Sequence, residues 1–98
     1  MRPFHFHPDA LLEADQAADF YEEQKRGLGK RFIESLTDAI NRIRRNPRLY
    51  PKVFDNIQKC RILRFPYGII YRDKDDSIEI IAVMHFKRKP FYWKKRLE

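Results

Sequence analysis

The chain has 98 residues, of which 43% are hydrophobic and 14% aromatic, so we expect one compact core and exclude a mainly disordered chain. Its formal net charge of +7 is uneven, because residues 1–58 carry 10 basic and 9 acidic side chains while residues 59–98 carry 11 and 5. A basic half attracts polyanions or an acidic protein partner, so RNA, DNA and an acidic peptide are all candidate ligands.

Cysteine content and the chain start indicate the compartment. Cys60 is the only cysteine, which excludes an intrachain disulfide. The first residues, MRPFHFHPD, contain no apolar stretch of the kind that an export signal needs, and no run is long enough to cross a bilayer. We therefore expect a cytoplasmic protein that does not enter the membrane.

The first 26 residues predict a short strand followed by a helix. FHFHP, residues 4–8, is aromatic and alternating and stops at a proline, and Asp9 is placed to accept backbone N–H groups at the helix start. The helix should continue to about Arg26, because apolar residues recur at three- and four-residue spacing. These residues are mostly alanine: Ala10, Leu11, Ala14, Ala17, Ala18 and Tyr21.

A second helix follows a tight turn at Gly27-Leu28-Gly29 and ends before Pro47. Its apolar stripe is stronger than the first, and consists of Phe32, Ile33, Leu36, Ala39, Ile40 and Ile43. Two helices joined by so short a turn predict an antiparallel hairpin, and the alanines of the first helix allow a close approach.

Beyond NPRLYP, residues 46–51, the sequence becomes rich in strand-forming residues. KCRILRF (59–65), YGIIYR (67–72) and SIEIIAVMHF (77–86) are separated by Pro66 and by the polar DKDD turn, which predicts an antiparallel meander. The last run is almost continuously apolar, so we expect it to be central, covered on both faces or flanked on both edges. The predicted order is β-α-α-β-β-β. This is an α+β domain spanning residues 1–98, with the helical hairpin on one face of a small, mainly antiparallel sheet.

This order and a series of short motifs resemble the RelE/ParE toxin superfamily. The motifs are Phe20-Tyr21-Glu22, Gly27-Leu28-Gly29, Asn46-Pro47 with Tyr50-Pro51, Arg61, Phe65-Pro66-Tyr67 to Tyr71, and Val83-x-His85-x-x-Arg88-x-Pro90-x-x-Trp93. The series resembles the ParE, or plasmid-stabilisation, branch more closely than the RelE branch.

The resemblance implies a small basic toxin from a two-gene module, neutralised by an antitoxin whose C-terminal segment wraps around it. It implies DNA gyrase as the target for ParE-like members, and cleavage of mRNA on the ribosome for RelE-like members. A non-toxic, degenerate binding module is a third possibility. We expect a toxin that binds its target and needs no cofactor. The sequence does not indicate an oligomeric state.

Two residues are candidates for chemistry if the chain cuts RNA. Such cleavage needs groups that accept and donate a proton, together with cations around the phosphate, and His85 and Tyr92 are the proton-transfer candidates. A histidine at the end of a buried strand can equally be a packed, hydrogen-bonded residue. We expect Trp93, with Phe91, to anchor the C-terminal segment on the sheet.

Four basic residues are candidates for binding the target or the antitoxin: Arg61, Arg64, Lys87 and Arg88. Arg61 shares a face of the predicted strand with Leu63 and Phe65, so it should have an anionic partner inside or outside the chain. Arg88 lies in a stretch without acids, where a phosphate or an antitoxin carboxylate could accept its guanidinium donors.

The remaining charged residues predict solvated surfaces rather than sites. Lys94, Lys95 and Arg96 should steer a ligand collectively, and the acids of the first helix should face water. These acids are Glu13, Asp15, Asp19, Glu22 and Glu23. His5 and His7 lie two residues apart without a four-ligand spacing, so no metal site is expected.

Overall fold

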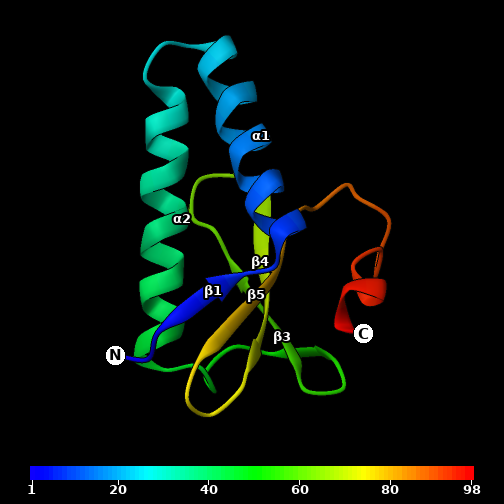
Figure 1. Cartoon of the computed structure of the whole chain (residues 1–98). Coiled ribbons are helices and arrows are strands. Elements are labelled where there is room, and N and C mark those ends of the chain that lie inside the picture. Colours follow the sequence, from blue (N-terminus) through cyan, green and yellow to red (C-terminus); the bar gives the residue numbers. More distant parts are fainter.

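The computed structural model describes all 98 residues as a helical hairpin packed on a sheet (Figure 1). The elements are β1 (Phe4–Phe6), α1 (Pro8–Gln24), α2 (Leu28–Arg45), β2 (Lys52–Phe54), β3 (Ile57–Arg61), β4 (Tyr67–Asp73), β5 (Ile78–His85) and the short 3-10 helix η1 (Lys94–Leu97). The α+β class, the hairpin and the three-strand meander are confirmed. The structure adds β2, which sequence analysis missed because these three residues directly follow the proline-bounded segment.

Helix α1 begins one residue earlier than expected and has a different cap. His7 is the N-cap, and its Nδ1 accepts the Asp9 backbone N–H at 3.1 Å. Pro8 occupies the first helical turn, where a missing N–H costs nothing. The prediction that Asp9 caps the helix is therefore wrong. Asp9 lies inside the first turn, where its negative charge interacts favourably with the helix dipole.

The turn between the helices depends on two glycines and on Glu22. Gly27 has φ 86°, which favours glycine, and a Cβ on Gly29 would lie 2.6 Å from the carbonyl oxygen of Ala18. The Glu22 carboxylate accepts the backbone N–H groups of Gly27 and Gly29 at 3.1 Å. Glu22 thus closes the turn instead of only facing water.

The sheet has the strand order β1-β5-β4-β3-β2. β1 pairs parallel with β5, and every other pair is antiparallel. The β4–β5 register shifts from Ile70↔Ala82 to Tyr71↔Ile80, which leaves Ile81 as the extra residue of a bulge. The bulge changes the alternation of side chains, so that consecutive residues of β5 can be buried on both faces of the sheet.

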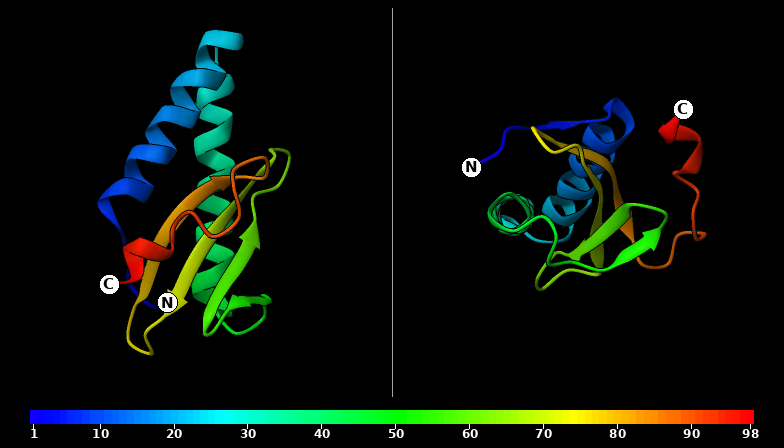
Figure 2. Two further views of the ribbon diagram at one scale, coloured as in Figure 1. Left: turned by 90° about the vertical axis from the view of Figure 1, so that its right-hand side faces the viewer. Right: turned by 90° about the horizontal axis from the view of Figure 1, so that it is seen from below.

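Both faces of the sheet are covered, as Figure 2 shows, by the helices on one side and by the C-terminal segment on the other. Ile80 and Val83 pack in the helix-side core, whereas Ile81 and Ala82 pack in a smaller cluster with Trp93, which is 1% exposed. The expectation that β5 is covered on both faces is confirmed, whereas its expected central position is wrong, because β4 is the middle strand of five.

Strand β3 ends at Arg61, four residues earlier than predicted. The Ile62 N–H donates to the Tyr67 carbonyl at 3.0 Å, and Arg64 has φ 72°, so the strand ends and the chain turns back toward β4. Leu63 is 50% exposed while Phe65 is buried. The prediction that Arg61 shares one apolar strand face with these two residues is therefore wrong.

Neither helix combines the length and the apolar character that spanning a bilayer requires.

The buried stripe of α2 can be tested by side-chain truncation. Leu36 and Ile40 are each 5% exposed, so Leu36→Ala or Ile40→Ala should lower the free energy of unfolding by about 2–5 kcal/mol in chemical denaturation. Ile33→Ala is the matched control, because Ile33 is 38% exposed on the same helix and should cost about 1 kcal/mol or less. Equal losses at all three positions would contradict the assignment of the buried face.

Candidate functional site

The edge of β5 beyond β1 has no neighbouring strand. β1 pairs with β5 only at Ile78–Ile80. Past this point the Val83 N–H donates to Glu13 Oε1 of α1 at 3.0 Å, and the Ile81 carbonyl accepts from Arg96 Nη1 at 3.0 Å. Two side chains thus replace the missing strand and satisfy backbone groups that would otherwise form an open edge.

Glu13, Tyr92 and Arg96 form a network over this edge, and we call these three residues the edge clamp. Arg96 Nη1 and Nη2 donate to the two Glu13 carboxylate oxygens at 2.9 and 3.0 Å, and the Tyr92 hydroxyl donates to Glu13 Oε2 at 2.6 Å. The side chains of Glu13 and Arg96 are only 12% and 9% exposed. A two-pronged, charge-assisted pair of this kind is among the stronger polar contacts in proteins.

The edge clamp fixes the protonation states of Arg96 and Tyr92. Burial by itself would lower the pKa of Arg96, but the hydrogen bonds and negative charge of Glu13 outweigh it, so this pKa is raised. Burial, followed by the hydrogen bond to Glu13 and its charge, raises the pKa of Tyr92. Tyr92 therefore stays a neutral donor, and Arg96 stays charged.

Two sequence interpretations are wrong at this point. Glu13 was expected on a solvated helix face, and Arg96 in a steering surface, yet both are largely buried and paired with each other. The two residues are 83 positions apart. No local pattern reveals such a contact, and the only hint is that Glu13 borders the alanine stripe between Ala10 and Ala14.

Arg88 lies next to the edge clamp but remains accessible. Its guanidinium carbon lies 3.9 Å from the centre of the Tyr92 ring, and its Nη1 lies 3.8 Å from Glu13 Oε2. The expectation of no nearby acid holds only along the sequence, because α1 supplies Glu13. The Arg88 side chain is still 52% exposed, and Arg96 already holds Glu13 at shorter distances, so Arg88 has donors available to a ligand.

His85 lines a small concavity beside Arg88. Its ring contacts Tyr67 edge-on with centroids 4.9 Å apart, and its Nδ1 accepts the Lys87 backbone N–H at 3.0 Å. Only Nε2 is left to exchange a proton with a ligand. Phe20 of α1 also lines this concavity, which has a volume of about 270 Å³ and contains Glu13 but not the Tyr92 side chain.

Arg61 belongs to a different cluster. Its guanidinium carbon lies 4.9 Å from the centre of the Phe86 ring, and Lys59 Nζ lies 4.6 Å from the same ring. Arg61 forms no ion pair, so of the two kinds of anionic partner expected for it, the one inside the chain is absent. Lys87, the residue after Phe86, is exposed. Arg61 and Arg88 therefore contact different rings.

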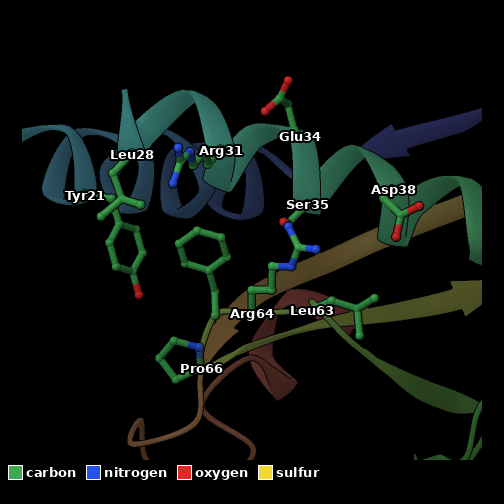
Figure 3. Close-up of a pocket in the computed structure, with 10 residues that line it drawn as sticks. Tyr21, Leu28, Arg31, Glu34, Ser35, Asp38, Leu63, Arg64 and Pro66 are labelled. Atoms are coloured by element: carbon green, nitrogen blue, oxygen red, sulfur yellow. The ribbon is translucent and has the colours of Figure 1, made fainter. Parts of the chain in front are cut away.

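Arg64 lies at a third place, in a groove between α2 and the segment after β3. Figure 3 shows Arg64 pointing toward Ser35 of α2, with Tyr21 and Leu28 at one end of the groove and Asp38 at the other. The groove has a volume of about 1000 Å³. The four predicted binding residues are thus spread over several surfaces and do not form one pocket.

The aromatic rings of the C-terminal segment have unequal roles. Trp93 is buried against the second face of the sheet, as expected for an anchor. Phe91 packs on Trp93 with centroids 5.8 Å apart but is 44% exposed, and Lys94 Nζ lies 4.9 Å from the centre of its ring. Trp93 and the edge clamp therefore hold the segment, while Phe91 covers Trp93.

Comparison with known proteins decides the family. Residues 4–90 match the family model described as the ParE toxin of the type II toxin–antitoxin system parDE. The chain belongs to the ParE toxin family. A solved structure titled chromosomal ParDE TA system from P. aeruginosa superposes with a TM-score of 0.62 at 14% identity, covering 87% of this chain and 96% of that one. This likeness supports the fold, and no curated protein sequence matches the chain.

The ParE match ends inside the basic C-terminal segment. It includes Glu13, His85 and Arg88, but Tyr92 and Arg96 follow its last residue. The two residues that close the edge clamp from the C-terminal side therefore lie outside the part of the chain that matches the family model.

The edge clamp predicts a large effect of a small change in charge. Glu13→Gln keeps the shape of the side chain but removes the close counter-charge of buried Arg96, leaving only Asp9 Oδ2 at 3.8 Å from Arg96 Nε, so the free energy of unfolding should fall by about 2–4 kcal/mol. Asp15→Asn on the exposed side of α1 is the control and should change it by about 0.5 kcal/mol or less. Chemical denaturation measures both. Equal, small losses of unfolding free energy in the two variants would show that the contacts of Glu13 do not stabilise the fold.

Proposed function

We propose that this ParE-family chain is the toxin component of a type II toxin–antitoxin module and acts in the cytoplasm by binding a macromolecular target, with DNA gyrase as the first candidate. Family membership supports the toxin role. The target, the compartment and the mode of action are the proposal. We also propose that residues 1–98 form a single toxin domain.

The hydrogen bonding and protonation of the Tyr92 hydroxyl are the reason that we propose binding and not RNA cleavage. A general acid or base must reach the reacting proton, and its pKa should lie near the working pH. The Tyr92 hydroxyl instead donates to Glu13 at 2.6 Å, and its pKa is raised. His85 retains one free ring nitrogen, since Lys87 occupies the other. One proton-transfer group therefore remains of the two that cleavage of a phosphodiester requires.

The exposed cations favour an acidic antitoxin segment as the natural inhibitor. Arg61, Arg64 and Lys87 form no ion pair within the chain, and half of the Arg88 side chain is exposed. Carboxylates of a partner can pair with these donors without competing against internal acids. Because the cations occupy several surfaces, we propose that the antitoxin wraps around the toxin instead of filling one cavity.

Induced expression in a bacterium tests the proposal. Growth, protein synthesis and DNA supercoiling are followed in parallel after induction. Arrested growth with lost supercoiling and continued early translation supports gyrase as the target. Rapid loss of translation with cut mRNA supports the endonuclease alternative, and unimpaired growth supports a non-toxic binding module.

Arg88→Ala should abolish toxicity while the fold stays intact, because Arg88 is half-exposed and Glu13 keeps its contact with Arg96. His85→Gln should weaken toxicity only modestly. Lys89→Ala is the control, since Lys89 is exposed in the same segment without a contact to the edge clamp. Growth after induction measures toxicity, and circular dichroism and denaturation of the purified variants measure folding.

The opposite outcome is equally specific. Purified protein that cuts ribosome-bound mRNA, with a cleavage rate about a hundredfold lower in folded His85→Gln or Tyr92→Phe, would make this segment an active site and contradict binding as the mode of action.

A further inference from the structure

An exposed apolar surface lies on the helical hairpin, away from the basic C-terminal segment. A groove of about 310 Å³ runs between α1 and α2 beside β1. Its floor consists of buried Ala14, Leu36 and Ile40, and its rim carries Phe4, Leu11 and Ile33, which are 38%, 47% and 38% exposed. We call these six residues the hairpin groove. Large apolar side chains gathered in this way mark an interaction surface.

The two helices that border the hairpin groove have opposite charge. α1 contains six acidic and no basic side chains, whereas α2 contains five basic and two acidic ones. Asp15 and Asp19 of α1 make no ion pair within the chain, and neither do Lys30 and Arg45 of α2. The two helices lie side by side and antiparallel (Figure 1). The surface is thus an apolar groove between an acidic and a basic strip.

We infer that the hairpin groove is a self-association surface whose occupant is the hairpin of a second copy of this chain. A two-fold axis that runs along the groove, parallel to the helices, sets α1 of one copy against α2 of the other, which brings each acidic strip to a basic strip. The same axis brings the exposed apolar rims together. A polyanion or an acidic peptide lacks this complementarity, since it would meet the unpaired acids of α1.

The size of the hairpin predicts a weak dimer. α2 has 18 residues, so the face is about 27 Å long, and two helices about 10 Å apart make it about 20 Å wide. An area of roughly 500–600 Å² per copy is at the lower end of specific interfaces. A dissociation constant of about 1–100 µM is therefore expected. The exposed arginines Arg61 and Arg88 are not in the groove, so each copy keeps its basic surfaces free.

Two neighbouring leucines provide a matched pair of variants. Leu11 and Leu12 are adjacent on α1 and 47% and 53% exposed, but only Leu11 lines the groove. Sedimentation of the purified chain from about 1 to 100 µM should show a reversible increase from 12.0 kDa toward twice that mass. Leu11→Glu should raise the dissociation constant about tenfold or more, and Leu12→Glu should change it about twofold or less. Circular dichroism confirms that both variants fold.

Asp15→Lys adds a test of the charge pattern. It should weaken the dimer because it places a positive charge against the basic strip of the second copy. A chain that stays monomeric at about 100 µM would overturn the inference, as would a dimer that Leu12→Glu disrupts and Leu11→Glu does not. If the chain is monomeric and Leu11→Glu lowers only the affinity for an antitoxin, the groove belongs to the antitoxin. None of these results depends on toxicity.

Discussion

The contact between Glu13 and Arg96 holds the C-terminal segment against the first helix. β1 is too short to cover β5, and the backbone groups of Ile81 and Val83 are satisfied by these two side chains instead. Without the contact, the edge of β5 would be open and buried Arg96 would lose its close counter-charge, with only Asp9 left at 3.8 Å. The first helix, the longest strand and the C-terminal segment therefore depend on one carboxylate.

This constraint also shapes the functional surface. The edge clamp and Trp93 hold the C-terminal segment against the sheet, which places Arg88 over the Tyr92 ring with half of its side chain in solvent. The Tyr92 hydroxyl is used to hold the fold, so the segment presents cations and not a pair of proton-transfer groups. A rigid cationic surface agrees with a toxin that binds its target. The hairpin carries a separate surface, with an apolar groove between an acidic helix and a basic one.

Sequence reasoning predicted the features that depend on local pattern. The 3.6-residue periodicity located both helices, the glycines located their turn, and β-rich runs located the meander. It failed where the deciding contact is distant: the role of Glu13 depends on Arg96, 83 residues away, and the end of β3 depends on a turn back to Tyr67. The candidate binding residues were chosen by residue type, but their separation into clusters is a property of the sheet, whose strand order no local pattern reveals.

A double-mutant cycle between Glu13 and Arg96 tests the central contact most directly. The free energies of unfolding of Glu13→Ala, Arg96→Ala and the double variant are compared with that of the unmodified chain. A buried, two-pronged pair predicts a coupling energy of about 1.5 kcal/mol or more, with the double variant little worse than either single one. A coupling energy below about 0.5 kcal/mol would show that the two residues act independently and that the C-terminal segment is held by other contacts.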